Sequence, residues 1–422
     1  MTYWFTEPAL KSLVPLAGAS AVRGLSTPFI VPKLFMGANA LSEAQGLGAG
    51  VFDMIAVSCQ QKRAFIVTDK HAVRYANRVS EVVKKSGFTT ETWDKAEPEA
   101  PLENVAGCAE AMNGFEPDVI VAVGGGSVID GAKAAWVLYE RPDITDLATV
   151  SPLFPLGLRK KAILVAIPTT SGTGSDCTAV SVVTDTSAKR KIPIVSPELM
   201  PDFSVLVPAF AAGMPPELTA GTGLDALTHA IDCVMSPMTN DFTDAMALRA
   251  IKMILRYLPR AYRDGTDHEA RLRMHIAASM AGIAFGNGGV ALTHAMGHAL
   301  GKTFGIHHGV AVGVFIPYAL QFYSPITDKY LDICEVLKIE GASSEASLAA
   351  LVERVRSFLR ELDIATDLKG LGIARDDFEK SFDTVVLHSF EDPSMFQSPR
   401  PATLEQCEAL FRYAYEGKDV DF

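Results

Sequence analysis

Most of the histidines that could do chemistry lie in one part of the sequence. The chain has nine histidines, and five of them fall in this part: His229, His294, His298, His307 and His308. Asp225 precedes His229 by one helical turn in GLDALTHAID, and His294 precedes His298 by the same spacing in LTHAMGHAL. Residues with this spacing project from one face of a helix. His308 follows in IHHG, beyond the helix end that we expect at Gly305.

The apolar surroundings of these pairs predict a metal site. A single histidine on an apolar helix is usually a core residue with a satisfied hydrogen bond, and a lone Asp-x-x-x-His pair is often a surface contact. Here both pairs lie in strongly apolar segments, where a buried carboxylate or imidazole needs a partner or a metal. One carboxylate with three imidazoles suits iron or zinc rather than magnesium or calcium, and leaves room for a substrate oxygen. Asp225 and four of the histidines compete for about four ligand positions, so one of them should serve another purpose.

A second group of residues fits a phosphate. The stretch Gly124–Lys133, GGGSVIDGAK, stands where an apolar strand gives way to a helix. Glycines there let backbone N–H groups approach a phosphate, and the helix N-terminus adds partial positive charge. Ser127 can cap that helix or bond a phosphate oxygen. The alternative is a tight strand–helix turn without a ligand, and the stretch is not a GxGxxG fingerprint.

Two further polar segments should share the same edge of a sheet. The loop Pro168–Asp176, PTTSGTGSD, follows a strand that ends at Ile167, and its hydroxyls and glycines could line a ribose, a diphosphate or a nicotinamide. Open α/β sheets bind ligands at the carboxyl ends of their strands. Asp69 also ends a strand, where a carboxylate can bond the 2′-hydroxyl of an adenosine ribose and repel the 2′-phosphate of NADP. The alternative for Asp69 is a helix N-cap before His71.

The elements that position these loops alternate between strand and helix. Apolar strands are expected at Phe29–Met36, Arg63–Asp69, Asp118–Val123 and Lys161–Ile167, and helices at His71–Gly87, Leu102–Phe115 and Val128–Glu140. Buried, β-branched strands between helices are typical of a parallel sheet covered on both faces.

After about Pro208 the sequence changes to segments with helical periodicity. These segments are Leu218–Met235, Asp241–Tyr262, Glu269–Phe285, Ala291–Thr303, Val310–Phe322, Ser344–Leu362, Asp376–His388 and Thr403–Tyr415. We therefore predict an α/β domain over residues 1–210, which begins with an N-terminal arm over residues 1–25, and an all-helical domain over residues 211–422.

Composition narrows the class of protein. A chain of 422 residues is too long for one ordinary core. Hydrophobic residues make up 48% and charged residues 21%, which is a globular composition. The net charge is −11 and no Lys/Arg cluster exists, so no nucleic-acid partner is expected. We expect neither a membrane helix nor a signal peptide. The six scattered cysteines, without a CxxC pair, suit a reducing cytoplasm.

Together these motifs resemble a known family. GGGSVIDGAK, PTTSGTGSD, GLDALTHAID and FGNGGVALTHAMGHALGKTFGIHHG are similar, in the same order, to the iron-containing (group III) alcohol dehydrogenases over roughly residues 30–420. The resemblance implies the dehydroquinate synthase-like architecture, in which an α/β dinucleotide-binding domain precedes an all-α domain and the active site lies between them. It also implies that the chain interconverts a primary alcohol and an aldehyde with NAD, using Fe²⁺ or, alternatively, Zn²⁺.

The resemblance assigns roles to individual residues. The metal ligands that it implies are Asp225, His229, His294 and His308, and His298 matches a nearby proton-relay histidine. The cofactor-binding residues that it implies are the pyrophosphate loop, three threonines of the second loop, a strand-end acid and a ribose-binding lysine: Gly124, Gly125, Gly126, Ser127, Thr169, Thr170, Thr173, Asp69 and Lys191. Asp69 stands at the position that favours NAD over NADP.

Some positions depart from the family pattern, and they leave alternatives open. Asp176 and Asp232 stand where the family usually has glutamate, and EPEAP at Glu97–Pro101 replaces the common PNP. Ser398–Phe411 and the SGTGSD loop also resemble the hydroxyacid–oxoacid transhydrogenase branch. A transhydrogenase that keeps its nicotinamide bound, a dehydroquinate synthase-type lyase and a non-enzymatic metal-binding protein therefore remain alternatives. We expect a small-molecule alcohol or aldehyde as substrate, and a homo-oligomer that is a dimer or larger.

Overall fold

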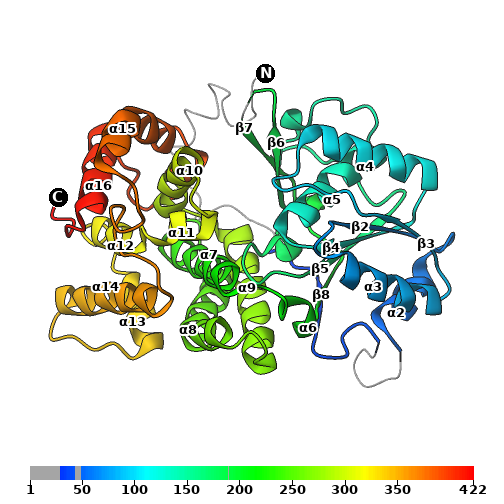
Figure 1. Ribbon diagram of the computed structural model, residues 1–422, viewed down its shortest axis with the longest axis horizontal. Helices are drawn as coiled ribbons and strands as arrows, with labels where there is room; N and C mark the ends of the chain where they lie inside the picture. The colour runs from blue at the N-terminus through cyan, green and yellow to red at the C-terminus, as the bar shows by residue number, and fades with distance from the viewer. Residues whose placement is uncertain (1–28, 43–48, 189) are drawn as a thin grey trace. The chain divides into compact units, whose positions relative to one another are not determined.

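The chain divides into two units in the computed structural model, which describes residues 29–42, 49–188 and 190–422 (Figure 1). The first unit contains Phe29–Met214, and the second contains Pro215–Phe422. Each unit has hydrophobic cores of its own, as expected of domains that can fold separately. The N-terminal arm expected over residues 1–25 lies outside the described residues.

A parallel sheet of six strands forms the centre of the first unit. Its strands are β1 (Lys33–Met36), β2 (Arg63–Thr68), β3 (Thr89–Trp93), β4 (Val119–Gly124), β5 (Ile163–Pro168) and β8 (Phe203–Leu206). Their order across the sheet is β1-β8-β5-β4-β2-β3, and every pairing is parallel. A separate antiparallel pair consists of β6 (Val180–Asp185) and β7 (Arg190–Val195). The predicted α/β class with a parallel sheet is confirmed.

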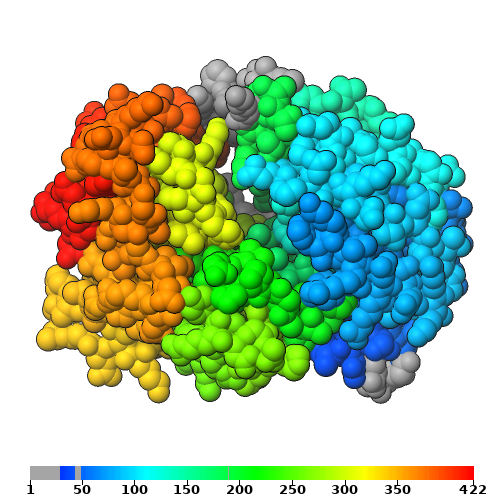
Figure 2. Space-filling model, viewed as in Figure 1, coloured from blue at the N-terminus to red at the C-terminus, as the bar shows by residue number. Residues whose placement is uncertain are grey.

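Alternate side chains of the sheet enter two separate cores. The helices of this unit are α2 (Val51–Ser58), α3 (Val73–Lys85), α4 (Leu102–Phe115), α5 (Gly126–Glu140) and α6 (Pro208–Ala211). In β2, Phe65 and Val67 pack with α4 and α5 on one face. Ala64 and Ile66 pack with α2 and α3 on the other face, because helical crossovers cover both sides of a parallel sheet. The space-filling view shows α3 and α4 over much of the visible surface of this unit (Figure 2).

The central strands end in register at one edge. Thr68 of β2 pairs with Val123 of β4, and Gly124 of β4 pairs with Pro168 of β5. The segments that follow these three strands therefore emerge side by side. They are the segments that begin at Asp69, Gly125 and Thr169, so the structure brings all three polar segments of the sequence to one edge of the sheet.

The sequence patterns fail to predict several helices and strands of this unit. The patterns do not predict β3, β8, α2 or the β6–β7 pair. β3, with the sequence TTETW, is an edge strand whose side chains are exposed or half-exposed, so it lacks the apolar run that marks a buried strand. β8 is buried but has only four residues, which is too short for a periodic signal.

The second unit is all-helical over its described residues. Its helices are α7 (Pro216–Met235), α8 (Asp241–Arg263), α9 (His268–Gly288), α10 (Leu292–Phe304), α11 (His308–Gly313), α12 (Ile316–Tyr323), α13 (Tyr330–Leu337), α14 (Ser344–Glu361), α15 (Arg375–Phe390) and α16 (Leu404–Glu416). α7 lies in the middle of their common core, because every residue from Thr219 to Met235 is buried. The predicted all-helical class of this half is confirmed.

One predicted helix of this unit is wrong as a continuous element. The segment Val310–Phe322 is split between α11, which ends at Gly313, and α12, which begins at Ile316. The break follows from Pro317, whose ring clashes with the carbonyl of Gly313 in a continuous helix and whose nitrogen has no hydrogen to donate. The sequence patterns also do not predict the short helix α13.

A sharp bend separates α9 from α10. No single helix of the described residues is long and apolar enough to cross a membrane, while α9 and α10 together meet that test but are bent by 110°. Gly289 at the bend has φ of +82°, a conformation that favours glycine. The Gln397 side chain accepts a hydrogen bond from the N–H of Val290 at 3.1 Å, which holds the bend from the C-terminal part of the chain.

Candidate metal centre and dinucleotide-binding loops

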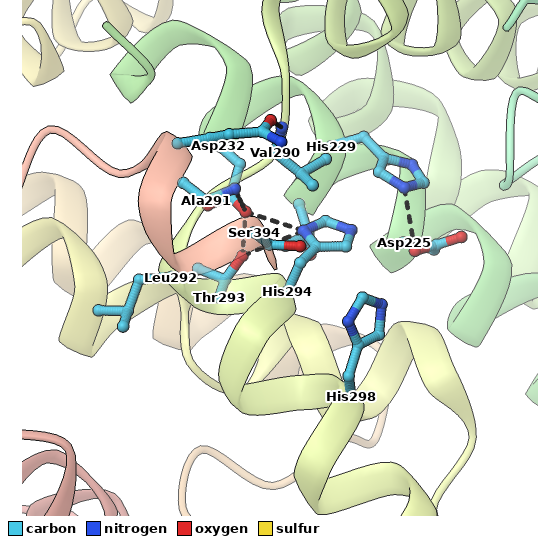
Figure 3. Close-up of polar contacts among 12 residues, drawn as sticks. Asp225, His229, Asp232, Val290, Ala291, Leu292, Thr293, His294, His298 and Ser394 are labelled. Carbon is cyan, nitrogen blue, oxygen red and sulfur yellow. Dashed lines mark hydrogen bonds and ion pairs between the residues drawn. The ribbon is translucent and has the colours of Figure 1, made fainter. Parts of the chain in front are cut away.

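Three helices of the second unit bring the predicted metal ligands together. α7 carries Asp225 and His229, α10 carries His294, and α11 begins at His308. Possible ligand atoms of the first three residues all lie within 4.8 Å of one another, and their side chains are buried. His308 completes the group, since its Nε2 lies 3.3 Å from Asp225 Oδ1. Figure 3 shows the rings of His229 and His294 beside the Asp225 carboxylate, with His298 one turn along α10.

The unsatisfied atoms of this group fit a metal. Asp225 Oδ1 and His294 Nε2 are both buried and have no hydrogen-bond partner. A buried polar atom without a partner costs about 1–3 kcal/mol, so two of them facing one cluster of ligand-type side chains need a further partner. Lone pairs on a carboxylate oxygen and an imidazole nitrogen are the donors that iron and zinc accept. The residues present therefore fit a divalent transition metal.

The charges in this group favour its ligand form. Burial alone would raise the pKa of Asp225, but the neighbouring imidazoles of His229 and His308 hold it well below its ordinary range. Burial lowers the pKa of His229 to about 3, although Asp225 acts in the opposite direction. Burial also lowers the pKa of His308. These pKa shifts keep Asp225 a carboxylate and favour neutral imidazoles at His229 and His308 at neutral pH, which are the protonation states that bind a metal.

Asp232 supports His294 from α7. Its Oδ2 accepts hydrogen bonds from the N–H of Ala291 at 2.8 Å and from the hydroxyl of Thr293 at 2.5 Å. The same oxygen lies 2.8 Å from His294 Nδ1. A carboxylate at Nδ1 fixes the orientation and the tautomer of the ring, so that Nε2 keeps its lone pair. The sequence marks Asp232 only as a departure from the family glutamate, and its place one turn after His229 is the signal that could have indicated this role.

His298 lies beside the group but has a different carboxylate partner. Its Nδ1 is 2.9 Å from Asp392 Oδ2, and its side chain is 41% exposed, against 3% for His294. Its ring stacks on that of His308 at 5.3 Å. Burial would raise the pKa of Asp392, which precedes the 3-10 helix η7 (Pro393–Gln397), but the contact with His298 lowers it. Sequence reasoning missed Asp392, which lies 94 residues from its partner.

Close packing fixes the positions of the rings and of α11. Phe285 stacks on His229 at 4.0 Å, and His229 stacks on His294 at 4.7 Å. A Cβ atom at Gly309 would lie 1.9 Å from the carbonyl oxygen of Gly221, so only glycine lets α11 approach α7 this closely. His307 is exposed, and it is not one of the residues that approach Asp225.

In the first unit, the glycine loop and the second polar loop pack against each other. The N–H of Thr169 donates to the carbonyl of Gly124 at 2.9 Å. A Cβ atom at Gly126 would lie 2.7 Å from Cγ2 of Thr173, and one at Gly125 would lie 3.4 Å from Cγ2 of Thr170. α5 begins at Gly126, and Gly125 is its N-cap without a side-chain bond. α5 therefore begins at glycines and without a side-chain cap, as expected of a helix N-terminus that binds a phosphate.

The remaining predicted cofactor residues have definite partners. Ser127 does not cap α5, since its hydroxyl oxygen accepts the N–H of Glu99 at 3.0 Å. The Glu99 carboxylate lies 3.3 Å from Lys191 Nζ, so the unusual EPEAP segment contacts two of the predicted positions. Asp69 Oδ1 accepts the N–H groups of His71 and Ala72, each at 2.7 Å. The helix N-cap considered for Asp69 is not present, because the N-cap of α3 is Ala72, without a side-chain cap. Asp69 instead uses one of its two carboxylate oxygens to hold the turn that precedes α3.

Two family models match most of the chain. A model described as iron-containing alcohol dehydrogenase matches residues 45–208. A model described as Fe-containing alcohol dehydrogenase family, C-terminal, matches residues 219–415. The first match covers the sheet and its glycine loop, and the second covers the helices that carry the candidate metal ligands.

Individual relatives agree with these matches. The chain is 36% identical over 365 residues to the NADPH-dependent butanol dehydrogenase of Clostridium saccharobutylicum, a match that covers 86% of this chain and 94% of that protein. It is 33% identical over 389 residues to the bifunctional aldehyde-alcohol dehydrogenase AdhE of Escherichia coli (strain K12), covering 85% of this chain but 43% of AdhE. A crystal structure of a 1,3-propanediol oxidoreductase is 30% identical, with a TM-score of 0.82, and covers 92% of this chain and 100% of that chain.

Proposed function

Because the chain belongs to the iron-containing alcohol dehydrogenase family, we propose that it oxidises a primary alcohol with NAD and that Asp225, His229, His294 and His308 hold its metal. Membership of this family makes the chain an oxidoreductase that interconverts alcohols and aldehydes. The metal assignment rests on one observation: these side chains converge, and Asp225 Oδ1 and His294 Nε2 are buried without hydrogen-bond partners.

In the proposed mechanism the metal and the nicotinamide provide the reactive groups, and the side chains of the protein transfer the proton and orient the metal ligands. When bound, the metal would supply a Lewis acid for the substrate oxygen, and the nicotinamide would supply the hydride acceptor. His298 takes up the proton that the alcohol releases and passes it to solvent, since its side chain is 41% exposed. Asp392 holds Nδ1 of this ring at 2.9 Å, which leaves Nε2 as the nitrogen that exchanges the proton. Asp232 keeps His294 in the tautomer that binds a metal.

The proposed preference for NAD rests on Asp69. One oxygen of this carboxylate is held by two backbone N–H groups, which fixes the side chain at the carboxyl edge of the sheet. A negative charge there would attract the hydroxyls of an adenosine ribose and repel a 2′-phosphate. The butanol dehydrogenase relative is named NADPH-dependent, so the choice of cofactor is a property to be measured for this chain.

Other features of the proposal concern the whole chain. We place the cofactor domain at residues 1–210 and the metal-binding domain at residues 211–422. A cytoplasmic location is also part of the proposal, and it is consistent with six cysteines that form no disulfide. A homo-oligomer, dimer or larger, is part of the proposal and is tested by size-exclusion chromatography with light scattering.

One experiment tests the central proposal. The protein is purified anaerobically, its metal is measured by elemental analysis, and NADH formation is followed with a panel of primary alcohols. We expect about one iron or zinc per chain and net NADH formation. A protein without a transition metal would contradict the metal site. NADH formation that requires an added oxoacid would indicate a transhydrogenase.

A further inference from the structure

A lysine lies fully buried behind the two loops of the first unit. Lys133, on α5, has no exposed surface. Its ammonium donates to the backbone carbonyls of Ser175, Thr178 and Val180, at 2.7, 2.8 and 2.8 Å. An ammonium has three N–H donors, so these carbonyls satisfy all of them. Lysine is almost never fully buried unless it is paired, which makes this arrangement a specific feature of the fold.

The three carbonyls belong to the segment where the second polar loop turns back. This loop leaves β5, turns at Gly174, where φ is +61°, and continues through the 3-10 helix η5 (Ser175–Cys177) into β6. Asp130, one turn before Lys133 on α5, accepts the hydroxyl of Ser175 and the N–H of Val182. One face of α5 therefore holds the returning arm of this loop, with Lys133 at its centre.

The same helix begins at the glycine loop. Gly126 is the first residue of α5, and it contacts Thr173 of the second loop so closely that a Cβ atom would lie 2.7 Å from the threonine methyl group. The outgoing arm of the second loop thus packs on the N-terminus of α5, while the returning arm is bound to Lys133. Both arms are held by one rigid helix.

We infer that Lys133 is a positioning residue for the dinucleotide. By binding the three carbonyls it holds residues 169–180 at a fixed distance from the glycine loop, so that the two loops present one preformed surface. Its complete burial keeps it from touching the cofactor. This inference rests on the proposed function, in which these loops hold NAD. Preformed loops bind more tightly because ordering them costs nothing at the moment of binding.

Glu140 provides a matched control on the same helix. It is also buried and charged, and it also binds three backbone groups, the N–H groups of Lys160, Lys161 and Ala162, at 3.1, 3.0 and 2.9 Å. These groups precede β5, at the amino end of the strand, whereas the residues that Lys133 binds follow β5 at its carboxyl end. Both anchors stabilise the fold, but only Lys133 shapes the edge where the loops lie.

The test compares Lys133→Met with Glu140→Gln in the full chain. NAD affinity is measured by calorimetry, thermal stability by Tm, and backbone mobility by hydrogen–deuterium exchange without cofactor. We expect Lys133→Met to weaken NAD binding by about tenfold or more, and to speed amide exchange in residues 169–182. Glu140→Gln should lower Tm but leave the Kd for NAD within about twofold.

Three results would overturn the inference. A folded Lys133→Met protein with unchanged Kd and exchange would show that the lysine has no positioning role. An equal loss of NAD affinity in Glu140→Gln would show that general destabilisation is the cause. If the wild-type protein binds neither NAD nor NADP, the proposed function fails first, and the inference fails with it. Should Lys133→Met not fold, Lys133→Gln keeps two N–H donors and should show a smaller weakening of NAD binding with the same pattern of exchange.

Discussion

The candidate metal centre and the dinucleotide-binding loops are assembled by different kinds of contact. On α7 and α10, residues one helical turn apart, such as Asp225 and His229, project from one face because the helix repeat places them there. At the sheet edge, Asp69, Gly125 and Thr169 come together only because three strands pair in register. A pattern within one helix can be followed along the sequence, whereas strand register has to be inferred from the fold. Removal of one side chain should accordingly cause a larger loss of bound metal and activity at the metal centre than of NAD affinity at the loops.

The largest effect is expected from the histidines of the metal centre. His294→Ala and His308→Ala should each reduce bound metal to less than about a tenth of the wild-type content, because metal affinity depends on the complete ligand set. Activity should be lost in parallel. His298→Ala should keep its metal but lower kcat by about a hundredfold and change the pH profile, as expected when a proton relay is removed.

Elemental analysis together with kcat measurements checks this prediction. His307→Ala is the control, because His307 adjoins His308 in the sequence but is exposed. It should retain both metal and activity. Equal metal loss in the His294, His298 and His308 variants would show that His298 is a ligand and that the proposed division of roles is wrong.

A smaller effect on the metal is expected from Asp232. Asp232→Asn removes the negative charge that lies 2.8 Å from His294 Nδ1 while keeping an oxygen acceptor for Ala291 and Thr293. Metal affinity should fall by about 10- to 100-fold, the range found for carboxylates that orient a metal-binding histidine. Competition with a metal indicator measures this, and Asp232→Glu should recover part of the affinity. An unchanged affinity in Asp232→Asn would contradict the supporting role.

At the loops, Gly126→Val should weaken NAD binding by about tenfold or more, which corresponds to about 1.4 kcal/mol or more of binding free energy. The new side chain would meet Thr173, whose Cγ2 lies 2.7 Å from the position of the added Cβ atom. Gly107→Val on α4 is the control, because a Cβ atom there meets nothing within 4 Å. Calorimetry measures both variants. A folded Gly126→Val protein with wild-type NAD affinity would rule out the glycine loop as a pyrophosphate site.

The smallest effect is expected at Asp69. Asp69→Gly should narrow the preference for NAD over NADP by about tenfold, by relieving repulsion of the 2′-phosphate. Asp69→Asn separates the charge from these hydrogen bonds in the turn, since its side-chain oxygen can still accept the N–H groups of His71 and Ala72. Both variants should change the ratio of kcat/KM for the two cofactors in the same direction. A wild-type enzyme that prefers NADP would contradict the role of Asp69.

The sequence predicts the elements with strong periodicity and misses those without it. α4 begins and ends at the predicted residues, and α7 differs by two residues at its start. In α4 the buried residues recur at helical spacing, and α7 is rich in apolar residues along its whole length, so the local pattern is enough. The edge strand β3, the short strand β8 and the break between α11 and α12 depend on pairing and on one proline, which a pattern averaged over a window does not reveal.

The sequence by itself determined the kind of chemistry. Two pairs at helical spacing, Asp225 with His229 and His294 with His298, together with His308, predicted a transition-metal site. Three glycines after an apolar strand predicted a phosphate site. In both cases a few neighbouring residues carry both the chemistry and the local geometry. These residues are the ones that approach each other in the structure.

Only the tertiary structure decided which residues position the histidines of the metal centre and the dinucleotide-binding loops. Asp392 holds His298 from 94 positions away, and Asp232 bonds His294 from 62 positions away. Lys133 binds carbonyls at a separation of 42 residues or more. Groups of this kind need hydrogen-bond partners when the chain packs around them. No local sequence pattern encodes these pairings, because each depends on the fold of every segment in between.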